Sequence, residues 1–416
     1  MKNHIFTGFG FGPIQAGLFA AEAFKSGNFK RIVIAEIDQK LVDAVRANGG
    51  SYYVNIASST GIEAIKIDGI EIYNPSNSSD RLKLIDALSV STEICTSLPS
   101  VDFYYAGENS VAEMIAAGLN RNKDRAVIVY AAENNNHAAE ILAEAVENKQ
   151  RKPFSGNVQF LNTVIGKMSQ VVTDKDEILQ KRLKTIAPGI DRAFLVEEFN
   201  EILVTKCHIK NFTPGIRVFI EKEDLLPFEE AKLFGHNAIH ALLAYLGASK
   251  GYKKMAELKN DKEIMQIAQD AFLNESGTAL IKKYKNLNDD LFTEAGYKVF
   301  AEDLLERMVN PYLDDTIERA ARDPQRKLGL NDRIFGTMQL ALEFGIEPEN
   351  MAIGVLAGIE TLLRNAEINK VPISLRFEPS DIDGAKIKII CEWLWHAKAG
   401  CYADEMMKCI QRAILE

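Results

Sequence analysis

Length, composition and charge describe a globular protein of about two domains. The chain has 416 residues, and domains usually hold roughly 100–200. With 47% hydrophobic and 26% charged residues it has enough apolar area to fold, so a largely disordered chain is excluded. The 58 acidic and 49 basic residues give a net charge of -9, which opposes binding to a phosphate backbone. We therefore expect no nucleic-acid partner.

Cysteine spacing and hydropathy exclude two further classes of protein. No C-x-x-C pair occurs among the five cysteines, so the sequence predicts neither a disulfide framework nor a thiolate zinc site. No apolar stretch reaches the ~20 residues that a membrane crossing requires. We expect a cytoplasmic protein with no metal and no membrane partner, and no pattern specifies an oligomeric state.

The first half of the chain alternates β-branched runs with helical patterns, which is typical of a parallel sheet with crossover helices. The predicted strands are His4 to Thr7, Arg31 to Ala35, Val101 to Tyr105 and Ala126 to Tyr130. The predicted helices that follow them are Pro13 to Lys25, Gln39 to Ala47, Val111 to Leu119 and Ala138 to Glu147. Between Tyr52 and Tyr73 the pattern predicts a hairpin-like insertion with a turn at Asp68 and Gly69.

After about Arg217 the β pattern fades and a 3.6-residue periodicity takes over. The change falls in the stretch from Asn211 to Pro227, which prolines and a glycine interrupt. The sequence therefore predicts an α/β protein. An N-terminal Rossmann-type domain (residues 1–215) binds a dinucleotide, and a mostly α-helical C-terminal domain (residues 216–416) binds substrate.

A glycine-rich turn follows the first predicted strand. Gly10, Phe11, Gly12, Pro13 and Ile14 stand where a Rossmann fold binds pyrophosphate, at the N-terminus of a helix. Such a pattern also occurs in strand–helix turns that bind nothing.

A carboxylate supports the nucleotide-binding interpretation. Glu36 ends the second strand, where it would accept hydrogen bonds from the adenosine ribose and repel the extra phosphate of NADP. We therefore predict NAD as the cofactor. Gln15 stands in place of the third glycine of the pattern.

A second candidate site lies on a predicted helix that begins near Pro227. At ~100° per residue, Glu229, His240 and Asn237 lie about 60°, 80° and 140° around this helix from Lys232, all in the same sense. A lysine in a dry cleft has a lowered pKa and exchanges a proton near neutral pH, while amide and imidazole groups stabilise a developing alkoxide. The same spacing fits an ordinary solvent-exposed Lys/Glu stripe, so it leaves both interpretations open.

The signature K-x-x-x-x-N-x-x-H, formed by Lys232, Asn237 and His240, resembles that of the polyol-specific long-chain dehydrogenases. The wider sequence is similar to the mannitol-1-phosphate 5-dehydrogenase branch of that family over most of its length. The strongest similarity lies in residues 232–247, 275–284 and 310–333. The resemblance implies a zinc-independent reaction and a Rossmann domain followed by a helical domain.

The resemblance also implies roles for individual residues. Lys232 would be the general acid/base, Asn237 would stabilise the oxyanion, and His240 would orient substrate and lysine. Asn162 matches an asparagine that completes the oxyanion site in the mannitol 2-dehydrogenase branch, although a turn or helix-cap role fits it equally.

Further residues either match the family pattern or depart from it. Glu133 and Asn134 resemble a Glu-Asn pair that follows the family's nucleotide-binding strand. Glu229 or its neighbour Glu230 would relay the proton. Gly166 stands where the family usually has an aspartate, a departure that concerns the cofactor side.

A basic cluster is the candidate for substrate recognition. Arg319, Arg322 and Arg326 follow a helical spacing, with Lys327 and Arg333 nearby. An arginine fork matches phosphate geometry, so Arg326 and Lys327 are predicted to bind the phosphate of a sugar alcohol. The alternative is a surface ladder of ion pairs with neighbouring carboxylates: Asp314, Asp315, Glu318 and Asp323.

Together these features predict an oxidoreductase that transfers a hydride between NAD and mannitol 1-phosphate or fructose 6-phosphate. Its partner is thus a small sugar alcohol or sugar phosphate. Two alternatives within the class are a dehydrogenase of a non-phosphorylated polyol and a reductase of a hexuronate such as tagaturonate or fructuronate. Outside the class, the chain fits a non-catalytic NAD-binding sensor.

Overall fold

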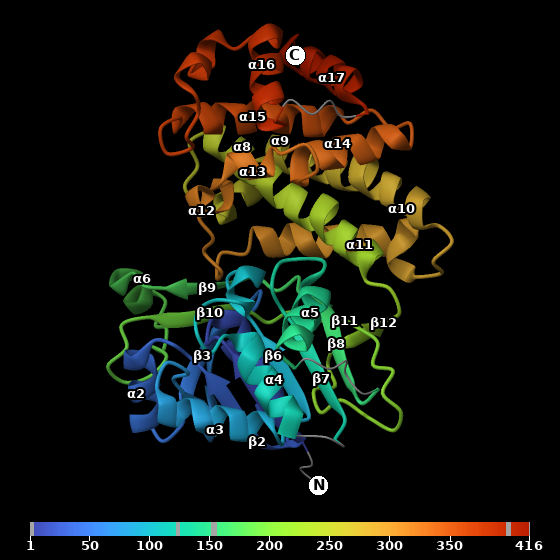
Figure 1. The fold of residues 1–416 in the computed structure, drawn as a ribbon. Coiled ribbons are helices and arrows are strands. Elements are labelled where there is room, and N and C mark those ends of the chain that lie inside the picture. Colours follow the sequence, from blue (N-terminus) through green and yellow to red (C-terminus); the bar gives the residue numbers. More distant parts are fainter. Residues whose placement is uncertain (1–3, 122–124, 151–155, 397–400, 416) are drawn as a thin grey trace. The chain divides into compact units, whose positions relative to one another are not determined.

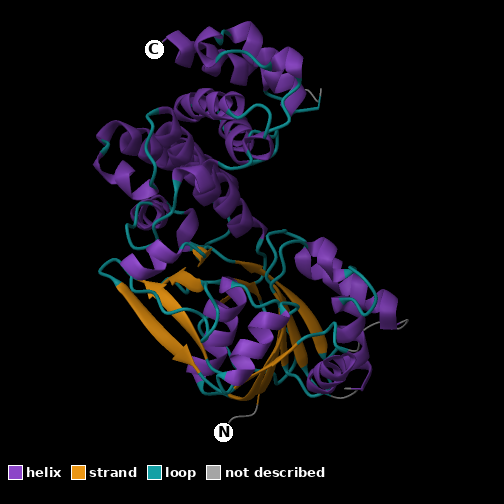
Figure 2. Ribbon diagram, turned by 90° about the vertical axis from the view of Figure 1, so that its left-hand side faces the viewer, coloured by secondary structure: helices purple, strands orange, loops and turns teal. Residues whose placement is uncertain are grey.

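The structure is a computed structural model that describes residues 4–121, 125–150, 156–396 and 401–415. The chain folds into two compact units, Met1–Leu226 and Pro227–Glu416 (Figure 1). The first unit ends at residue 226, whereas the sequence predicts that the first domain ends at residue 215. Figure 2 shows strands gathered in the first unit and helices building the second.

The main sheet of the first unit has the strand order β12-β11-β8-β7-β6-β1-β2-β5. Strands β8, β7, β6, β1, β2 and β5 are parallel, and β11 is antiparallel to β8. The bounds of these strands are β1 His4–Phe9, β2 Phe29–Ala35, β5 Ile70–Tyr73, β6 Glu93–Thr96, β7 Val127–Ala131, β8 Val158–Val164, β11 Leu203–Thr205 and β12 Ile220–Lys222.

The connections reverse direction between β1 and β6. The chain leaves β1 toward β2 and β5 on one side, then returns to pair β6 with the other edge of β1, Gly8 opposite Cys95 and Phe9 opposite Thr96. Such a switch point opens a crevice at the carboxyl ends of the strands, where α/β proteins bind ligands. The glycine-rich turn follows β1 at this edge. The predicted Rossmann-type fold class is thus confirmed.

Helices cover this sheet, and a second sheet of order β4-β3-β10-β9 packs against them. The first helix contacts this second sheet through Gly17, because a Cβ there would lie 2.7 Å from Val196 Cγ1 and 3.2 Å from Val54 Cγ1. The remaining bounds in this unit are β3 Tyr52–Ala57, β4 Ile62–Ile67, β9 Ser169–Val172, β10 Ala193–Glu197, η1 Gln15–Phe19, α1 Ala20–Ser26, α2 Gln39–Ala47, α3 Ser78–Leu88, η2 Val101–Tyr104, α4 Val111–Arg121, α5 Ala138–Gln150 and α6 Lys175–Gln180.

The prediction of a strand at Val101 to Tyr105 is wrong. This segment is the 3-10 helix η2, which begins where the Ser100 side chain accepts a hydrogen bond from Asp102 N. The strand is β6, a few residues earlier. Strand β6 has only four residues, Glu-Ile-Cys-Thr, and begins with the buried acidic residue Glu93, so the sequence pattern did not indicate a strand there.

The hairpin-like insertion is only partly as predicted. Strands β3 and β4 do pair antiparallel, but β5 joins the main sheet beside β2. The turn at Asp68 and Gly69, where Gly69 has φ +73°, therefore leads from one sheet into the other. Two adjacent strands of β pattern carry no local sign of which sheet each will join.

The second unit is a helical assembly around α8, whose residues are almost all buried. Helix α15 packs closely on α8 because Gly354 lies against Leu242 and Gly358 against Tyr245. The elements of this unit are α7 Leu226–Glu230, η3 Ala231–Asn237, α8 Ala238–Ser249, η4 Met255–Asn260, α9 Lys262–Asp270, η5 Ala271–Gly277, α10 Thr278–Tyr284, η6 Asp290–Phe292, α11 Glu294–Met308, α12 Ile317–Ala321, α13 Pro324–Lys327, α14 Arg333–Glu343, α15 Glu349–Arg364, η7 Ile373–Leu375, η8 Pro379–Asp381, α16 Gly384–Leu394 and α17 Ala403–Leu415.

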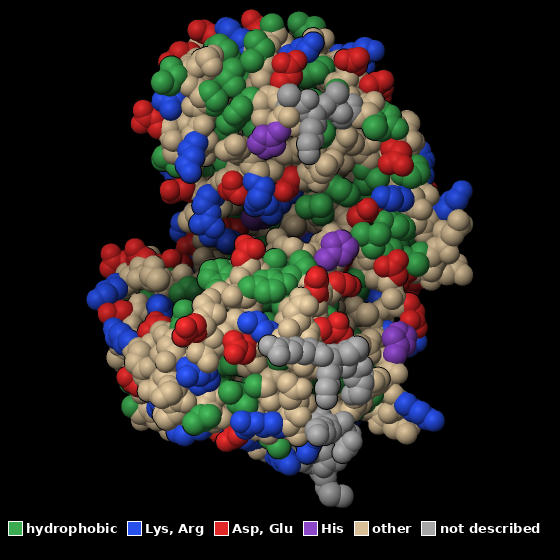
Figure 3. Space-filling view, in the orientation of Figure 1, with side chains coloured by type: hydrophobic (Ala, Val, Ile, Leu, Met, Phe, Trp, Pro, Cys, Tyr) green, Lys and Arg blue, Asp and Glu red, His purple; other side chains and the backbone are tan. Residues whose placement is uncertain are grey.

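Acidic and basic side chains are interspersed over the face drawn in Figure 3. Within the described ranges, no helix has the length and apolar character that a bilayer crossing demands. Across the same residues, no three His, Cys, Asp or Glu side chains are grouped so that they could hold a metal ion.

Candidate active site

The glycine turn after β1 touches the loop after β6. Gly10 has φ +83°, and a Cβ at this residue would lie 2.5 Å from the carbonyl oxygen of Ser97. The N–H of Ser97 in turn donates to Phe9 O at 3.0 Å. Both the backbone conformation and the close approach require glycine at position 10. The two loops that border the switch point are therefore locked together.

The rest of the turn leaves its backbone open. Apart from Gly12 and its neighbours along the chain, no described residue has a heavy atom within 4 Å of the place where a Cβ on Gly12 would be, so this face is available to a ligand. Pro13 and Ile14 begin the helix. Phe11 is buried, with its ring edge-on to Tyr52 and Phe194, so its side chain anchors the turn in the core. These features fit the pyrophosphate cradle of a dinucleotide.

Gln15, which replaces the third glycine, is accommodated by a second glycine. A Cβ on Gly8 of β1 would lie 1.5 Å from Gln15 Nε2, so the amide occupies the space that a side chain at position 8 would fill. Gln15 is fully buried, and its amide has no hydrogen-bond partner among the described residues. Helix and strand therefore still pack closely, with the roles of the two positions exchanged.

Glu36 follows β2 directly, as predicted. Its Oε1 accepts the N–H of Asp38 at 2.8 Å, and its own N–H donates to Tyr73 O at 3.0 Å. The side chain is partly buried at the carboxyl edge of the sheet. A carboxylate held in this way is suited to accept hydrogen bonds from ribose hydroxyls.

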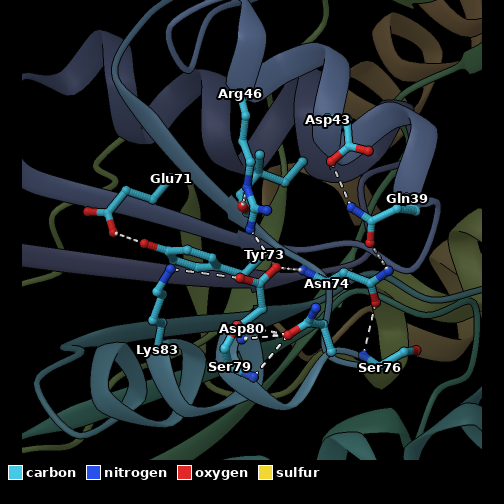
Figure 4. A network of polar contacts seen from close by, with 12 residues as sticks. Gln39, Asp43, Arg46, Glu71, Tyr73, Asn74, Ser76, Ser79, Asp80 and Lys83 are labelled. Atoms are coloured by element: carbon cyan, nitrogen blue, oxygen red, sulfur yellow. Dashed lines mark hydrogen bonds and ion pairs between the residues drawn. The ribbon is translucent and has the colours of Figure 1, made fainter.

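A polar network fixes the loop after β5, next to Glu36 (Figure 4). Arg46 of α2 donates to Ile72 O at 2.9 Å and to Asp80 Oδ2 at 2.5 Å. The same Asp80 oxygen accepts the N–H of Asn74 at 3.0 Å. The network ties α2, α3 and the end of β5 together, so the backbone that holds Glu36 is well supported.

Glu133 is buried, and its carboxylate is occupied by protein groups. It accepts hydrogen bonds from Thr96 Oγ1 at 3.0 Å, from Leu98 N at 2.9 Å and from the Tyr104 hydroxyl. Burial raises its pKa, although these donors oppose the rise. Asn134 is exposed. In this structure Glu133 therefore holds the loop after β6, the same loop that contacts Gly10.

Asn162, on β8, caps helix α5. Its Oδ1 accepts the N–H of Ala139 at 2.8 Å, and its Nδ2 donates to both Glu140 carboxylate oxygens, at 3.0 and 2.8 Å. Of the two roles that the sequence leaves open, this geometry is that of the helix-cap asparagine. Both ends of the amide are used within the first unit.

The helix that carries Lys232 is not a regular α-helix, and the expectation of ~100° per residue is wrong for part of it. Residues Ala231–Asn237 form the π-helix η3, between α7 and α8. A π-helix bonds residue i to i+5, at roughly 80° per residue. The angle between Lys232 and Asn237 thus falls from about 140° to about 40°, and His240 comes nearly into line with Lys232. The π segment gathers the three residues more tightly than predicted.

Packing explains where the π segment sits. A Cβ on Gly235 would lie 2.9 Å from both Phe272 Cε2 and the Tyr297 hydroxyl. Phe272 belongs to η5, another π-helix, and Gly277 of η5 also lies against Tyr297. Single-turn π segments occur frequently at functional sites, where they re-aim side chains.

The electrostatic surroundings lower the pKa of Lys232. Burial lowers it to about 8, the positive charge of Arg333 acts in the same direction, and Glu229 opposes them. Its neighbour Glu230 instead accepts hydrogen bonds from Lys283 at 2.7 Å and from Tyr284 at 2.6 Å. Of the two glutamates that the sequence leaves open for a proton relay, Glu229 is therefore the one that acts on Lys232.

His240 is held by a carboxylate that no sequence pattern indicated as a site residue. Its Nε2 lies 3.0 Å from Asp315 Oδ2, and Asp315 Oδ1 accepts a hydrogen bond from Arg319 Nε at 2.7 Å. Burial would raise the pKa of Asp315, but His240 and Arg319 outweigh it and hold it at about 2. The sequence signal was available as the Asp-Asp pair before α12, but nothing local indicated its partner on α8.

His236 is a further residue that the sequence motif did not single out. It is buried on η3, and burial lowers its pKa well below the usual value, helped by the charges of His240, Arg307 and Lys232. It stays neutral at physiological pH and lines the same part of the helix.

The predicted phosphate ligands are largely used by the protein itself. Arg326 pairs with Asp323 at 2.6 Å and with Asp332 at 3.3 Å, as in the ion-pair alternative. Lys327 is buried, and its ammonium donates to Ala320 O at 2.5 Å. Burial lowers the pKa of Lys327 to about 7.

The sequence of this chain is similar to those of known proteins. Residues 224–372 match the model of the mannitol dehydrogenase C-terminal domain. A mannitol-1-phosphate 5-dehydrogenase of Buchnera aphidicola is 28% identical over 388 residues, covering 92% of each chain. The enzyme of the same name from Aureobasidium melanogenum is 28% identical over 363 residues, covering 86% of this chain and 85% of the relative.

Two solved structures share the fold. A substrate-free D-sorbitol dehydrogenase superimposes with a TM-score of 0.78 at 15% identity, covering 99% of this chain and 93% of its own. Pseudomonas fluorescens mannitol 2-dehydrogenase, solved with NAD and D-mannitol, gives a TM-score of 0.69 at 18% identity, covering 99% and 91%. Residues 224–372 of this chain therefore match the mannitol dehydrogenase C-terminal domain, and the chain over most of its length is similar to mannitol-1-phosphate 5-dehydrogenases.

Proposed function

We propose that this protein is an NAD-dependent, metal-independent dehydrogenase that interconverts a sugar-alcohol phosphate and a ketose phosphate. Mannitol 1-phosphate and fructose 6-phosphate are the proposed pair. The observation that carries the proposal is Lys232, whose pKa is lowered to about 8 within a mannitol dehydrogenase C-terminal domain. An amine with this pKa exchanges protons at physiological pH, which an ordinary surface lysine does not.

The first unit supplies the cofactor site. Gly10, Gly12 and the start of the helix at Pro13 would hold the pyrophosphate, and Glu36 would accept hydrogen bonds from the ribose. The negative charge of Glu36 favours NAD over NADP. The nicotinamide, when bound, accepts or supplies the hydride.

The second unit supplies the proton. During polyol oxidation the carbinol carbon loses a hydride and its hydroxyl loses a proton, which neutral Lys232 takes up. During ketose reduction the ammonium form of Lys232 returns that proton to the carbonyl oxygen. Asn237, which ends the π segment, would donate a hydrogen bond to the same oxygen. His240, fixed through Nε2 by Asp315, orients the substrate with its other ring nitrogen.

One assay tests this function directly. NADH consumption is followed in parallel with fructose 6-phosphate, fructose and tagaturonate. We expect the highest kcat/KM with fructose 6-phosphate. A preference for fructose or tagaturonate would replace the substrate with a neutral polyol or a hexuronate. No NADH consumption with any of the three compounds, together with measurable NADH binding, would favour a non-catalytic NAD-binding sensor.

A further inference from the structure

One arginine of the second unit has buried guanidinium atoms that make no hydrogen bond within the described part of the chain. Arg333 begins α14, and Asp332 caps that helix by accepting Arg333 N at 2.8 Å. Its guanidinium atoms Nε and Nη1 are buried and have no hydrogen-bond partner among the described residues. The Asp332 carboxylate stays 3.9 Å from Nε, too far for a hydrogen bond. Buried donors of a charged group are costly to leave unpaired, so a partner is expected.

A second unpaired donor lies near the first. The hydroxyl of Tyr245, on α8, is also buried without a partner in the described part of the chain. Burial raises the pKa of Tyr245, and Arg333 is the first charge that counters the rise. The Tyr245 ring packs on Gly358, where a larger residue would displace it. An arginine and a tyrosine hydroxyl thus share one unsatisfied region.

Arg333 acts electrostatically on the lysines of this region. Arg326 pairs with Asp323 and Asp332, and Asp332 also lies 3.9 Å from Arg333 Nε. After burial, Arg333 is the largest cause that lowers the pKa of Lys327 to about 7, and likewise that of Lys232 to about 8. Arg333 therefore places a positive potential beside the proposed acid/base, and together with its unpaired donors this favours an anionic group over a neutral hydroxyl.

We propose that the Arg333 guanidinium and the Tyr245 hydroxyl bind the phosphate group of the sugar-phosphate substrate. This assignment rests on the proposed function and replaces the expected pair Arg326 and Lys327. Guanidinium donors match phosphate oxygens in geometry and charge, and a tyrosine hydroxyl adds one further donor. Lys327, which donates to Ala320 O, adds positive charge to the region only when it is protonated.

The first test is a change of substrate preference. Arg333→Met removes the charge and donors but keeps the length of the side chain. We expect the ratio of kcat/KM for fructose 6-phosphate to that for fructose to fall roughly 10- to 100-fold, the effect of losing hydrogen bonds to a charged group. Arg364→Met, which removes an exposed arginine paired with Glu360 on α15, is the matched control and should leave the ratio unchanged. An unchanged ratio in Arg333→Met would overturn the assignment.

The second test does not require turnover. Inorganic phosphate should raise the Tm of the wild-type protein and of Arg364→Met, but not that of Arg333→Met. If the wild type turns over none of the sugars yet shows this phosphate effect, the anion site stands and the proposed function fails. If it turns over fructose 6-phosphate and Arg333→Met behaves as wild type in both tests, the function stands and the anion site fails.

Two further outcomes also decide. Should circular dichroism show that Arg333→Met is unfolded, Tyr245→Phe, which removes one hydroxyl, carries the test with an expected loss of preference of roughly 3- to 10-fold. No loss in that variant would overturn the proposal. Tagaturonate as the best substrate, with its turnover lost in Arg333→Met, would assign the site to a carboxylate and overturn the phosphate assignment.

Discussion

Asp315 Oδ2 lies 3.0 Å from Nε2 of His240, so one side of the imidazole is fixed by a buried carboxylate. The same carboxylate pairs with Arg319, and its low pKa keeps it ionised throughout the physiological range. Only Nδ1 of the ring is then left to face a substrate. Asp315 is a positioning residue, because it acts through His240 and the protein supplies it with both partners.

Asp315→Asn should lower kcat by at least about 10-fold, because an amide no longer selects the ring tautomer that the carboxylate holds. The pH profile should change as well, which loss of packing alone would not cause. The measurement is kcat across pH for ketose reduction. Asp86→Asn, at an exposed ion pair with Arg121, is the control. A wild-type kcat and profile in Asp315→Asn would remove this residue from the mechanism.

The lowered pKa of Lys232 predicts opposite pH dependences for the two directions. Polyol oxidation needs the neutral amine, so its kcat/KM should rise as pH increases through about 8. Ketose reduction needs the ammonium form and should fall over the same interval. Because the charge of Arg333 lowers this pKa, Arg333→Met should shift both the rise in oxidation and the fall in reduction to higher pH. If the rise and the fall of kcat/KM occur at the same pH in Arg333→Met as in the wild type, the electrostatic coupling between Arg333 and Lys232 is contradicted.

Gly8 and Gln15 should be coupled in stability. Gly8→Ala places a methyl group where the Gln15 amide lies, and overpacking of this kind costs about 1–3 kcal/mol of unfolding free energy. Gln15→Gly removes the clash, so the double variant should recover most of the loss. Chemical denaturation of the two single variants and the double variant gives the coupling energy. Additive effects would show that the two positions do not share one space.

Much of the fold could be predicted from the sequence because its signals are local. Helix α2 follows from a capping Asp38 and an amphipathic pattern, and β1, the glycine turn and Glu36 follow one another along the chain. The strand β6 was missed because it has only four residues and begins with Glu93, a buried acidic side chain. Its partners at Tyr130 and Gly215 are distant in sequence.

The candidate site was predictable to the extent that a short motif carries it. Lys232, Asn237 and His240 stand on one helix, but a π segment is a departure in backbone hydrogen bonding that helical periodicity does not reveal. Asp315 lies in the loop before α12, and Arg333 begins α14. The sequence indicates both only as members of a charged cluster, and tertiary packing brings them to His240 and Lys232. Arg326 looked like a phosphate ligand because its counter-ions could not be assigned from spacing alone.

Glu133 should affect NADH binding through the loop that it holds. In Glu133→Gln one acceptor oxygen becomes a donor that faces the N–H of Leu98 or the hydroxyl of Thr96. We expect the loop beside Gly10 to loosen and the Kd of NADH to rise about 10-fold, near the cost of one lost charged hydrogen bond. Fluorescence titration measures this change, with the exposed Glu113→Gln as control. An unchanged Kd would show that the loop does not depend on Glu133.

The role of Lys232 as proton donor is measured most directly by the rate of NADH oxidation by Lys232→Ala with fructose 6-phosphate at saturating cofactor. We expect wild-type NADH affinity and a fall in kcat on the order of 10²-fold or more, because the proton donor is gone while the nucleotide site in the first unit is intact. Turnover equal to that of the wild type would show that Lys232 is not the acid/base.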